Sequence, residues 1–264
     1  MTGLIEKFEA KNYSDLLIID GHMHLGKPYN FFSGDNTAES LIRSMDLNGI
    51  RLGCISSLHA IGQDAQKGNS DIEELVAGYP DRFIGQFGVN PNYPEEVDTI
   101  LQDVKGKKCF RQIKIHPSLH KYPVNGEQYH KLYRFGCEYN NPLLSHTWGI
   151  KDIRDFDEIA DQYPGLKIIL GHSGGEIDAI REAAGVAQKR KNVYLDITIS
   201  YNYQGLIEWL AGEVPAEKLL FGSDAAYNSQ SAALGKVIYA DISDDAKACI
   251  LGLNMKKLLG NNGM

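Results

Sequence analysis

The chain of 264 residues is long enough for one large domain or two small ones, and 43% of its residues are hydrophobic, which is enough for a sizeable core. It carries 27 Lys and Arg against 34 Asp and Glu, a formal net charge of −7. This acidic balance disfavours binding to nucleic acid or to an anionic membrane surface, and no apolar run approaches the roughly 18 residues that span a bilayer.

Short apolar runs, many of them rich in β-branched residues, recur along the chain and predict eight strands. The starts of these runs are about 25 to 35 residues apart, which is the length of a strand followed by a helix. The predicted strands are Leu16–Asp20, Arg51–Ser57, Phe83–Val89, Arg111–His116, Pro142–His146, Lys167–Leu170, Val193–Ile197 and Lys218–Phe221.

Helical patterns separate the predicted strands. Asn36-Thr-Ala-Glu39 resembles a capping box at a helix start, and Pro94 followed by two acidic residues is typical of another. The predicted helices are Thr37–Asn48, Asp71–Gly78, Pro94–Val104, Gln128–Tyr139, Ile153–Tyr163, Glu176–Gln188, Tyr203–Ala211, Ser229–Tyr239 and Asp244–Leu259.

Eight such βα units predict an α/β fold, a single (β/α)8 TIM barrel that forms one domain over residues 1–264. The alternative is an open doubly wound sheet. That fold usually carries a Gly-rich phosphate loop after its first strand, and the sequence contains neither G-x-G-x-x-G nor a P-loop.

Candidate metal ligands gather at one end of the predicted barrel, where the chemistry of such enzymes lies. Strand alternation predicts that Asp20, His22 and His24 share one face toward the barrel mouth. Further candidates lie at or after later strand ends: His59, His116, His146, His172 and Asp224. One such histidine would most simply be a hydrogen-bonded core or surface residue, but six at one end indicate a metal site. Imidazoles with a carboxylate suit zinc, manganese or iron.

Several motifs resemble the amidohydrolase superfamily, and more narrowly its amidohydrolase-2 group of TIM-barrel hydrolases and decarboxylases. The motifs are Asp20-Gly-His22-Met-His24, His146, His172-Ser-Gly-Gly175, Phe221-Gly-Ser-Asp224 and Leu253-Asn254. The resemblance implies one divalent ion held by His22, His24, His146 and Asp224, with zinc the first choice and manganese or iron also suited. It further implies that His172 is the catalytic histidine, and that Asp224 also takes a proton from the metal-activated water.

Lys114 leaves two metal arrangements open. In the two-metal branch of the superfamily a strand-4 lysine becomes carboxylated and bridges both ions, and Lys114 lies on the inward face of predicted strand 4. The overall pattern resembles the one-metal group more closely, in which Lys114 or His116 would contact a substrate carboxylate or carbonyl. We expect His59, Lys114 and His116 to be substrate-binding residues.

The first functional hypothesis is a metal-dependent hydrolase of a small amide, ester or lactone. The second is a metal-dependent non-oxidative decarboxylase of an unsaturated or aromatic acid. Such decarboxylases usually have longer loops and often an arginine that binds the substrate carboxylate. The loops of this chain are short and no arginine stands clearly at a strand end, which favours hydrolysis. A TatD-like nuclease would match the chain length and the Gly88-Val-Asn-Pro91 segment, but that group expects a glutamate where this chain has Lys114 and His116. A catalytically dead binding barrel ranks last, because every expected ligand position is filled.

The expected partner is a small-molecule substrate, without nucleic acid or membrane, and a homodimer is the default assembly. Charged residues interrupt the apolar residues near the N-terminus, so no signal-peptide core is visible, and the four cysteines form no C-x-x-C pair. We therefore expect a cytoplasmic protein. Loop aromatic residues are expected to line the pocket: Tyr29, Phe31, Phe32, Tyr201 and Tyr203.

Overall fold

The computed structural model describes residues 3–27, 33–198 and 203–260. The described residues form one sheet of eight parallel strands, in which each strand pairs with the next along the chain. The strands are β1 (Ile19–Leu25), β2 (Leu52–Ser57), β3 (Phe83–Gly88), β4 (Phe110–Ile115), β5 (Leu143–His146), β6 (Ile168–Gly171), β7 (Val193–Asp196) and β8 (Leu219–Leu220).

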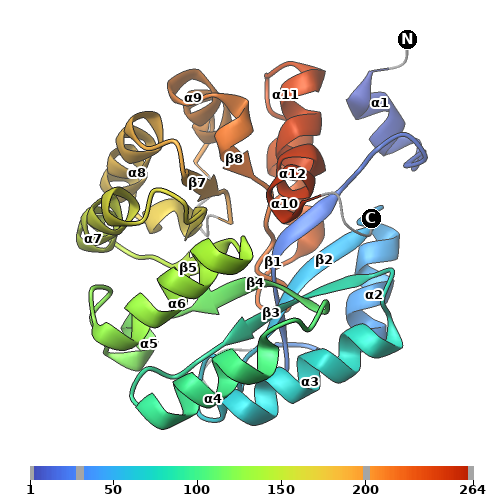
Figure 1. Cartoon of the computed structure of the whole chain (residues 1–264). Coiled ribbons are helices and arrows are strands. Elements are labelled where there is room, and N and C mark those ends of the chain that lie inside the picture. The colour runs from blue at the N-terminus through green and yellow to red at the C-terminus, as the bar shows by residue number, and fades with distance from the viewer. Residues whose placement is uncertain (1–2, 28–32, 199–202, 261–264) are drawn as a thin grey trace.

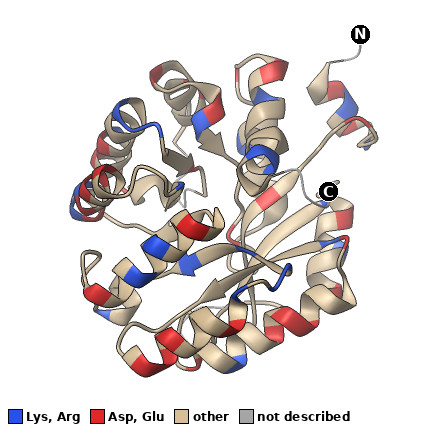
Figure 2. Ribbon diagram, in the orientation of Figure 1, with Lys and Arg blue, Asp and Glu red and all other residues tan. Residues whose placement is uncertain are grey.

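Helices surround this sheet on its outer side (Figure 1). They are α1 (Leu4–Glu9), α2 (Ala38–Leu47), α3 (Ala65–Gly78), α4 (Pro94–Val104), α5 (Pro117–His120), α6 (Glu127–Tyr139), α7 (Ile150–Gln162), α8 (Ile177–Lys189), α9 (Leu206–Glu213), α10 (Gln230–Ile238), α11 (Asp244–Ala248) and α12 (Asn254–Leu259). Lys, Arg, Asp and Glu lie mainly on these helices, with the two signs interspersed (Figure 2). Within the described ranges, none of the helices has both the length and the apolar character that crossing a membrane requires.

The barrel closes between the segment after β8 and strand β1. The Gly21 N–H donates to the Phe221 carbonyl at 3.0 Å, and the Asp224 N–H donates to the His22 carbonyl at 2.8 Å. A bridge between Met23 and Ala225 continues this pairing. The predicted (β/α)8 barrel is therefore confirmed, and its closure brings the ends of the first and last strands together.

The barrel interior is apolar at one end and polar at the other. The apolar layer contains strand residues together with side chains of α12, which cover this end of the barrel. Its members are Ile19, Leu52, Cys54, Ile84, Leu144, Ile169, Leu220, Met255, Leu258 and Leu259. Towards the carboxyl ends of the strands follow buried polar side chains, among them Gln86, Gln112 and Lys114. Burying polar side chains costs free energy unless they are hydrogen-bonded or paired. A layer of them at one end of the barrel therefore indicates that a functional site lies there.

Most helices lie within three residues of their predicted bounds, α1 and α5 have no predicted counterpart, and two helices differ more strongly. Helix α3 begins at Ala65 instead of Asp71, because the Asp64 carboxylate caps it by accepting from the Lys67 N–H. The predicted helix Asp244–Leu259 is α11 and α12 separated by a π-helical turn, Cys249–Leu253. In that turn the Ile250 carbonyl accepts from the Phe221 N–H at 3.0 Å, so a tertiary contact accompanies the change in helical pitch.

Candidate functional site

Strand β1 is irregular within the stretch that carries Asp20, His22 and His24. Across it β1 advances by one residue more than β2, which is the signature of a β-bulge. Asp20 consequently does not join the histidines: its carboxylate accepts from the Ser223 N–H at 2.9 Å and from Gln230 Nε2 at 3.0 Å. The expectation that strict alternation keeps Asp20 on their face is wrong, because the bulge interrupts the alternation.

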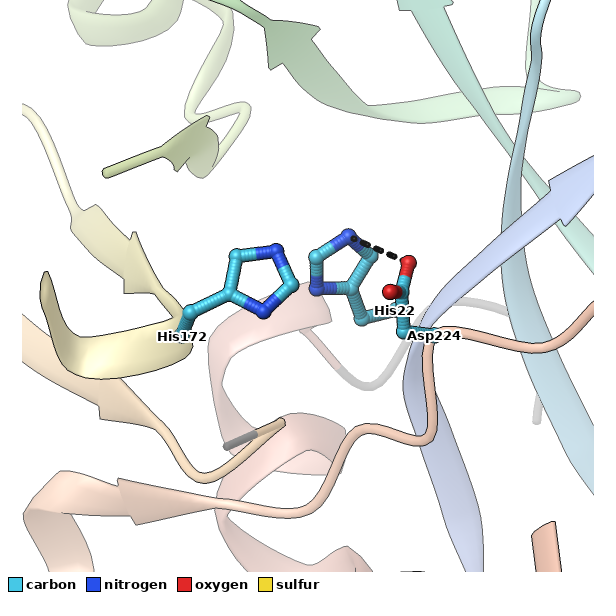
Figure 3. A group of neighbouring side chains, drawn as sticks. All are labelled: His22, His172 and Asp224. Carbon is cyan, nitrogen blue, oxygen red and sulfur yellow. Dashed lines mark ion pairs between the residues drawn. The ribbon is translucent and has the colours of Figure 1, made fainter. Parts of the chain in front are cut away.

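His22, His24 and Asp224 converge at the barrel mouth. His24 Nε2 lies 3.2 Å from both His22 Nε2 and Asp224 Oδ1, and His22 Nε2 lies 3.7 Å from Asp224 Oδ1. His172 joins the group, since ligand atoms of His22, His172 and Asp224 all lie within 4.8 Å of one another (Figure 3). His22 and Asp224 therefore lie close both to His24 and to His172, and these side chains come from β1, the turn after β6 and the segment after β8.

A buried carboxylate that the sequence analysis did not single out, Asp196 at the end of β7, orients two of these histidines. Its Oδ2 accepts from His22 Nδ1 at 2.8 Å and from the His172 backbone N–H at 3.2 Å. Its Oδ1 accepts from the Thr198 N–H at 3.1 Å, and the Thr198 carbonyl accepts from His172 Nδ1 at 2.6 Å. The available signal was an acidic residue at the carboxyl end of a predicted strand.

The third histidine is held in the same way. His24 Nδ1 lies 2.9 Å from the buried Ser56 Oγ on β2. In His22, His24 and His172 alike, Nδ1 has a partner outside the cluster and Nε2 is left to face it. This arrangement is usual for metal-bound histidines, because the outer partner fixes the ring orientation. At His22 and His172 the partner can only accept, so it also fixes the tautomer.

His146 occupies a neighbouring position. Its ring stacks on that of His116, with centroids 3.8 Å apart and planes 13° apart, and its centroid lies 4.7 Å from that of His172. Among the described residues, the group of ligand atoms that lie within 4.8 Å of one another comprises those of His22, His172 and Asp224, without His24 or His146. That His146 is a metal ligand stays a prediction.

Of the three expected substrate-binding residues, the structure brings two to the site. Lys114 is buried and its Nζ lies 2.6 Å from His22 Nε2, while His116 lines the same cavity. His59 is not among the described residues that line this cavity. Its half-exposed ring lies 3.4 Å from the Asp71 carboxylate of α3, because the loop after β2 directs the side chain toward that helix.

The cavity above the cluster has a volume of ≈ 340 Å³. Among the described residues it is lined by His24, Ile61, Lys114, His116, His146, Trp148, His172, Asp224, Tyr227 and Asn228. Four residues proposed as pocket aromatics fall outside the described residues: Tyr29, Phe31, Phe32 and Tyr201. Tyr203 is described, is largely exposed and lines a different cavity. Among the described residues, Trp148 and Tyr227 are aromatic side chains that line the cavity above the cluster.

Backbone strain marks two residues of the cluster. Both His172 and Asp224 have a φ of 60°, in the left-handed region that residues with a side chain rarely adopt. Such strain persists where the surrounding structure enforces it, and it concentrates at functional sites.

Burial and neighbouring charges set the protonation of the cluster. Burial, followed by the Lys114 charge, holds the pKa of His22 well below its usual range, and burial also lowers the pKa of His24. Burial alone would raise the pKa of Asp224, but the hydrogen bond from His24 and the neighbouring histidines lower it overall. Neutral imidazoles beside an ionised carboxylate are the protonation states in which these groups bind metal.

The donor set therefore fits a divalent transition metal. Imidazole nitrogens with one carboxylate suit zinc, manganese or iron, and three protein ligands leave a coordination position for water or substrate. Lys114 adds a cation beside the cluster, and burial lowers its pKa to about 8 although Asp224 and Asp196 act in the opposite direction.

The sequence model described as Amidohydrolase matches residues 19–260. The chain belongs to the amidohydrolase family. No curated protein matches it in sequence.

Solved structures support the same fold for this amidohydrolase-family chain. An uncharacterised TIM-barrel protein from Bordetella bronchiseptica is 20% identical with a TM-score of 0.77, covering 94% of this chain and 100% of that one. 2,6-Dihydroxybenzoate decarboxylase from Rhizobium is 16% identical with a TM-score of 0.74, and the match covers 94% of this chain and 100% of that one. 5-Carboxyvanillate decarboxylase from Novosphingobium aromaticivorans is 16% identical with a TM-score of 0.73, and the match covers 94% of this chain and 97% of that one. That structure is a complex with manganese and 4-hydroxy-3-methoxy-5-nitrobenzoic acid.

Gly222 is packed between the groups that orient His22. A Cβ at this position would overlap Thr198 Oγ1, Asp196 Oδ1 and His22 Cβ. We expect Gly222→Ala to lower the free energy of unfolding by about 1–3 kcal/mol. It should also weaken metal binding, because the added methyl group displaces Asp196 from His22. Urea unfolding and a zinc titration measure the two effects.

Gly185→Ala is the matched control for this substitution. Gly185 lies in α8, and nothing lies within 4 Å of the position of its missing Cβ. Because alanine is the better helix former, this variant should be as stable as the unmodified protein or more stable, by roughly 0.5–1 kcal/mol. Similar losses in both variants would show that the packing around Gly222 is not special.

Proposed function

We propose that the protein is a metal-dependent hydrolase that acts on a small amide, ester or lactone. The observation that carries the proposal is the convergence of His22, His24 and Asp224, whose ligand atoms lie 3.2 to 3.7 Å apart. We propose zinc as the ion. The resemblance to the amidohydrolase-2 group adds His146 as the fourth ligand. When bound, a divalent ion acts as a Lewis acid and lowers the pKa of water to about 7, which permits hydrolysis at neutral pH.

Two residues of the cluster are suited to guide water and its proton. His172 donates its Nδ1–H to the Thr198 carbonyl, so Nε2 keeps its lone pair and can accept a proton. Asp224 stays ionised, and its carboxylate can accept a hydrogen bond from the attacking water. We assign proton transfer to His172 and orientation of the water to Asp224, which reverses the expectation that Asp224 takes the proton.

Lys114 supplies positive charge on the same side of the cavity. Its Nζ donates toward His22 Nε2 at 2.6 Å, and although burial lowers its pKa, the charges of Asp224 and Asp196 act to raise it and so favour its ammonium form. In the one-metal arrangement we propose that it polarises the substrate carbonyl. A carboxylated Lys114 that bridges two ions is the competing arrangement, because the amine already lies beside the cluster.

Decarboxylation of an unsaturated or aromatic acid is the second candidate. Two of the similar structures are aromatic-acid decarboxylases, and the Lys114 ammonium is a suitable partner for a carboxylate. Hydrolysis stays the first choice because no arginine, the usual partner of a substrate carboxylate, is among the described residues that line the cavity. A small-molecule substrate, a homodimeric state and a cytoplasmic location stay predictions.

The test combines metal analysis with a substrate screen. Protein purified without chelator is expected to contain about one first-row divalent ion per chain. The zinc-loaded protein is then assayed on esters, lactones, amides and unsaturated carboxylic acids, with both acid release and carbon dioxide followed. Acid release that disappears after chelation is the expected result.

Two outcomes would change the proposal. Carbon dioxide from an unsaturated acid, with no ester, lactone or amide turned over, would replace hydrolysis with decarboxylation. Two ions per chain, together with the extra mass of a carboxyl group on Lys114, would replace the one-metal arrangement.

A further inference from the structure

The side chain of His116 is placed by the local chain direction. His116 follows β4 and immediately precedes α5, and the proline after it disfavours a helical backbone; its φ is −140° and its ψ is 76°. Strand alternation puts its ring on the same inward side as Lys114. The ring lines the cavity of ≈ 340 Å³ beside the cluster.

Hydrogen bonds determine which ring nitrogen of His116 carries the proton. The Leu119 backbone N–H donates to His116 Nδ1 at 3.3 Å, and Ser118 Oγ lies 3.2 Å from the same nitrogen. A backbone N–H can only donate, so Nδ1 is the acceptor. In a neutral imidazole the proton is then on Nε2.

Packing keeps the ring in this orientation. His116 stacks on His146 with nearly parallel planes, so a half-turn of the ring is the alternative that fits the same space. That half-turn would present a C–H to the Leu119 N–H and leave the amide without its acceptor. Because Nδ1 accepts the Leu119 N–H, it carries no proton, and the ring is neutral.

The remaining polar edge of the ring is its Nε2–H. The hydrogen bonds of the described residues include none at this nitrogen, and the ring borders the cavity. A polar group in such a position donates its hydrogen bond to water or to a ligand. With the proton fixed on Nε2, the ring can only donate to a ligand at that edge.

We propose that His116 is a specificity-determining residue whose Nε2–H donates a hydrogen bond to a carbonyl or carboxylate oxygen of the bound substrate. The inference rests on the proposed function for the existence of such a substrate, whereas the position of the proton does not depend on it. A donor of fixed polarity favours substrates with an acceptor at this point and rejects analogues that present only a donor there, such as an amide N–H.

The position of the proton is measured without any assay of activity. Long-range ¹⁵N–¹H spectra of zinc-loaded protein labelled at histidine distinguish a protonated from an unprotonated ring nitrogen, and the signals lost in His116→Gln identify this residue. We expect one neutral tautomer with the proton on Nε2. Ser118→Ala is the control, because the Leu119 N–H still holds Nδ1 and the tautomer should not change.

The donated hydrogen bond is measured with acetohydroxamate as a carbonyl probe. His116→Phe keeps a flat ring but has no donor, whereas His116→Gln places an amide N–H near the position of Nε2. We expect at least about tenfold weaker binding of the probe to His116→Phe, and binding within roughly threefold of the unmodified protein for His116→Gln. The kcat/KM of an ester found in the screen should follow the same order, with the zinc content unchanged.

The outcomes separate this inference from the proposed function. A proton on Nδ1, or probe binding by His116→Phe equal to that of the unmodified protein, would overturn the inference even if esters are hydrolysed. Where the tautomer and the binding order are as expected but no hydrolysis is found, the role of His116 is supported and the proposed reaction is not.

Discussion

Replacing Asp224 with asparagine is expected to lower the affinity for zinc by more than a hundredfold. The carboxylate lies 3.2 Å from His24 Nε2 and 3.7 Å from His22 Nε2, so its charge is part of the ligand cluster. Asparagine keeps the shape and removes the charge. Loss of a group that merely supports a ligand typically costs 10–100-fold in metal affinity, and loss of the ligand should cost more. Competition with a chelating dye measures the affinity.

Two further carboxylates calibrate this result. Asp196 accepts from His22 Nδ1 and contributes no atom to the group of ligand atoms, so Asp196→Asn is expected to lose roughly 10–100-fold in zinc affinity. Asp152 lies in the first turn of α7, and its carboxylate accepts from the Trp148 N–H at 2.8 Å. Asp152→Asn is the control and should bind zinc as the unmodified protein does. If Asp224→Asn behaves like Asp152→Asn, Asp224 is not a ligand.

The convergence of these residues could be predicted because it follows from strand order alone. Parallel strands that are covered on both sides appear in the sequence as short apolar runs, and the predicted runs at Lys167–Leu170 and Val193–Ile197 overlap β6 and β7. Polar residues that end such runs must meet at one rim once the barrel closes. The position of His172 and Asp224 near His22 needed no further information.

Contacts between distant segments could not be predicted in this way. Asp196 and His22 are 174 residues apart, and no local pattern indicates that the carboxylate accepts from that ring. The bulge that turns Asp20 away is set by pairing with β2 and by hydrogen bonds from Ser223 and Gln230, which are equally remote. Strand alternation holds only while the register is regular.

His59 illustrates the limit for loop residues. The end of a strand fixes where the next residues begin but not which way a loop side chain turns. In the structure Asp71, on the first turns of α3, lies within 3.4 Å of the His59 ring and accounts for its direction. Because α3 begins six residues earlier than predicted, this carboxylate already lies inside the helix and faces the loop.

His172→Asn is expected to lower turnover by roughly 10²–10⁴-fold while the protein keeps its zinc. The asparagine amide can donate to the Thr198 carbonyl as Nδ1 does, but it has no group in the place of Nε2. The variant therefore removes the proposed proton acceptor and leaves the outer hydrogen bond. Zinc content by elemental analysis, zinc affinity by dye competition and steady-state rates on the same substrate separate the two effects.

The experiment is informative because two assignments compete for this ring. The resemblance implies that His146 is the ligand and His172 the catalytic residue, whereas the ligand atoms that lie within 4.8 Å include those of His172. His146→Asn supplies the comparison: as a ligand it should lose zinc as Asp224→Asn does. If His172→Asn loses the ion and His146→Asn keeps it, the roles are exchanged. The proton acceptor would then be sought at His146, whose ring lies next to that of His172 and stacks on His116.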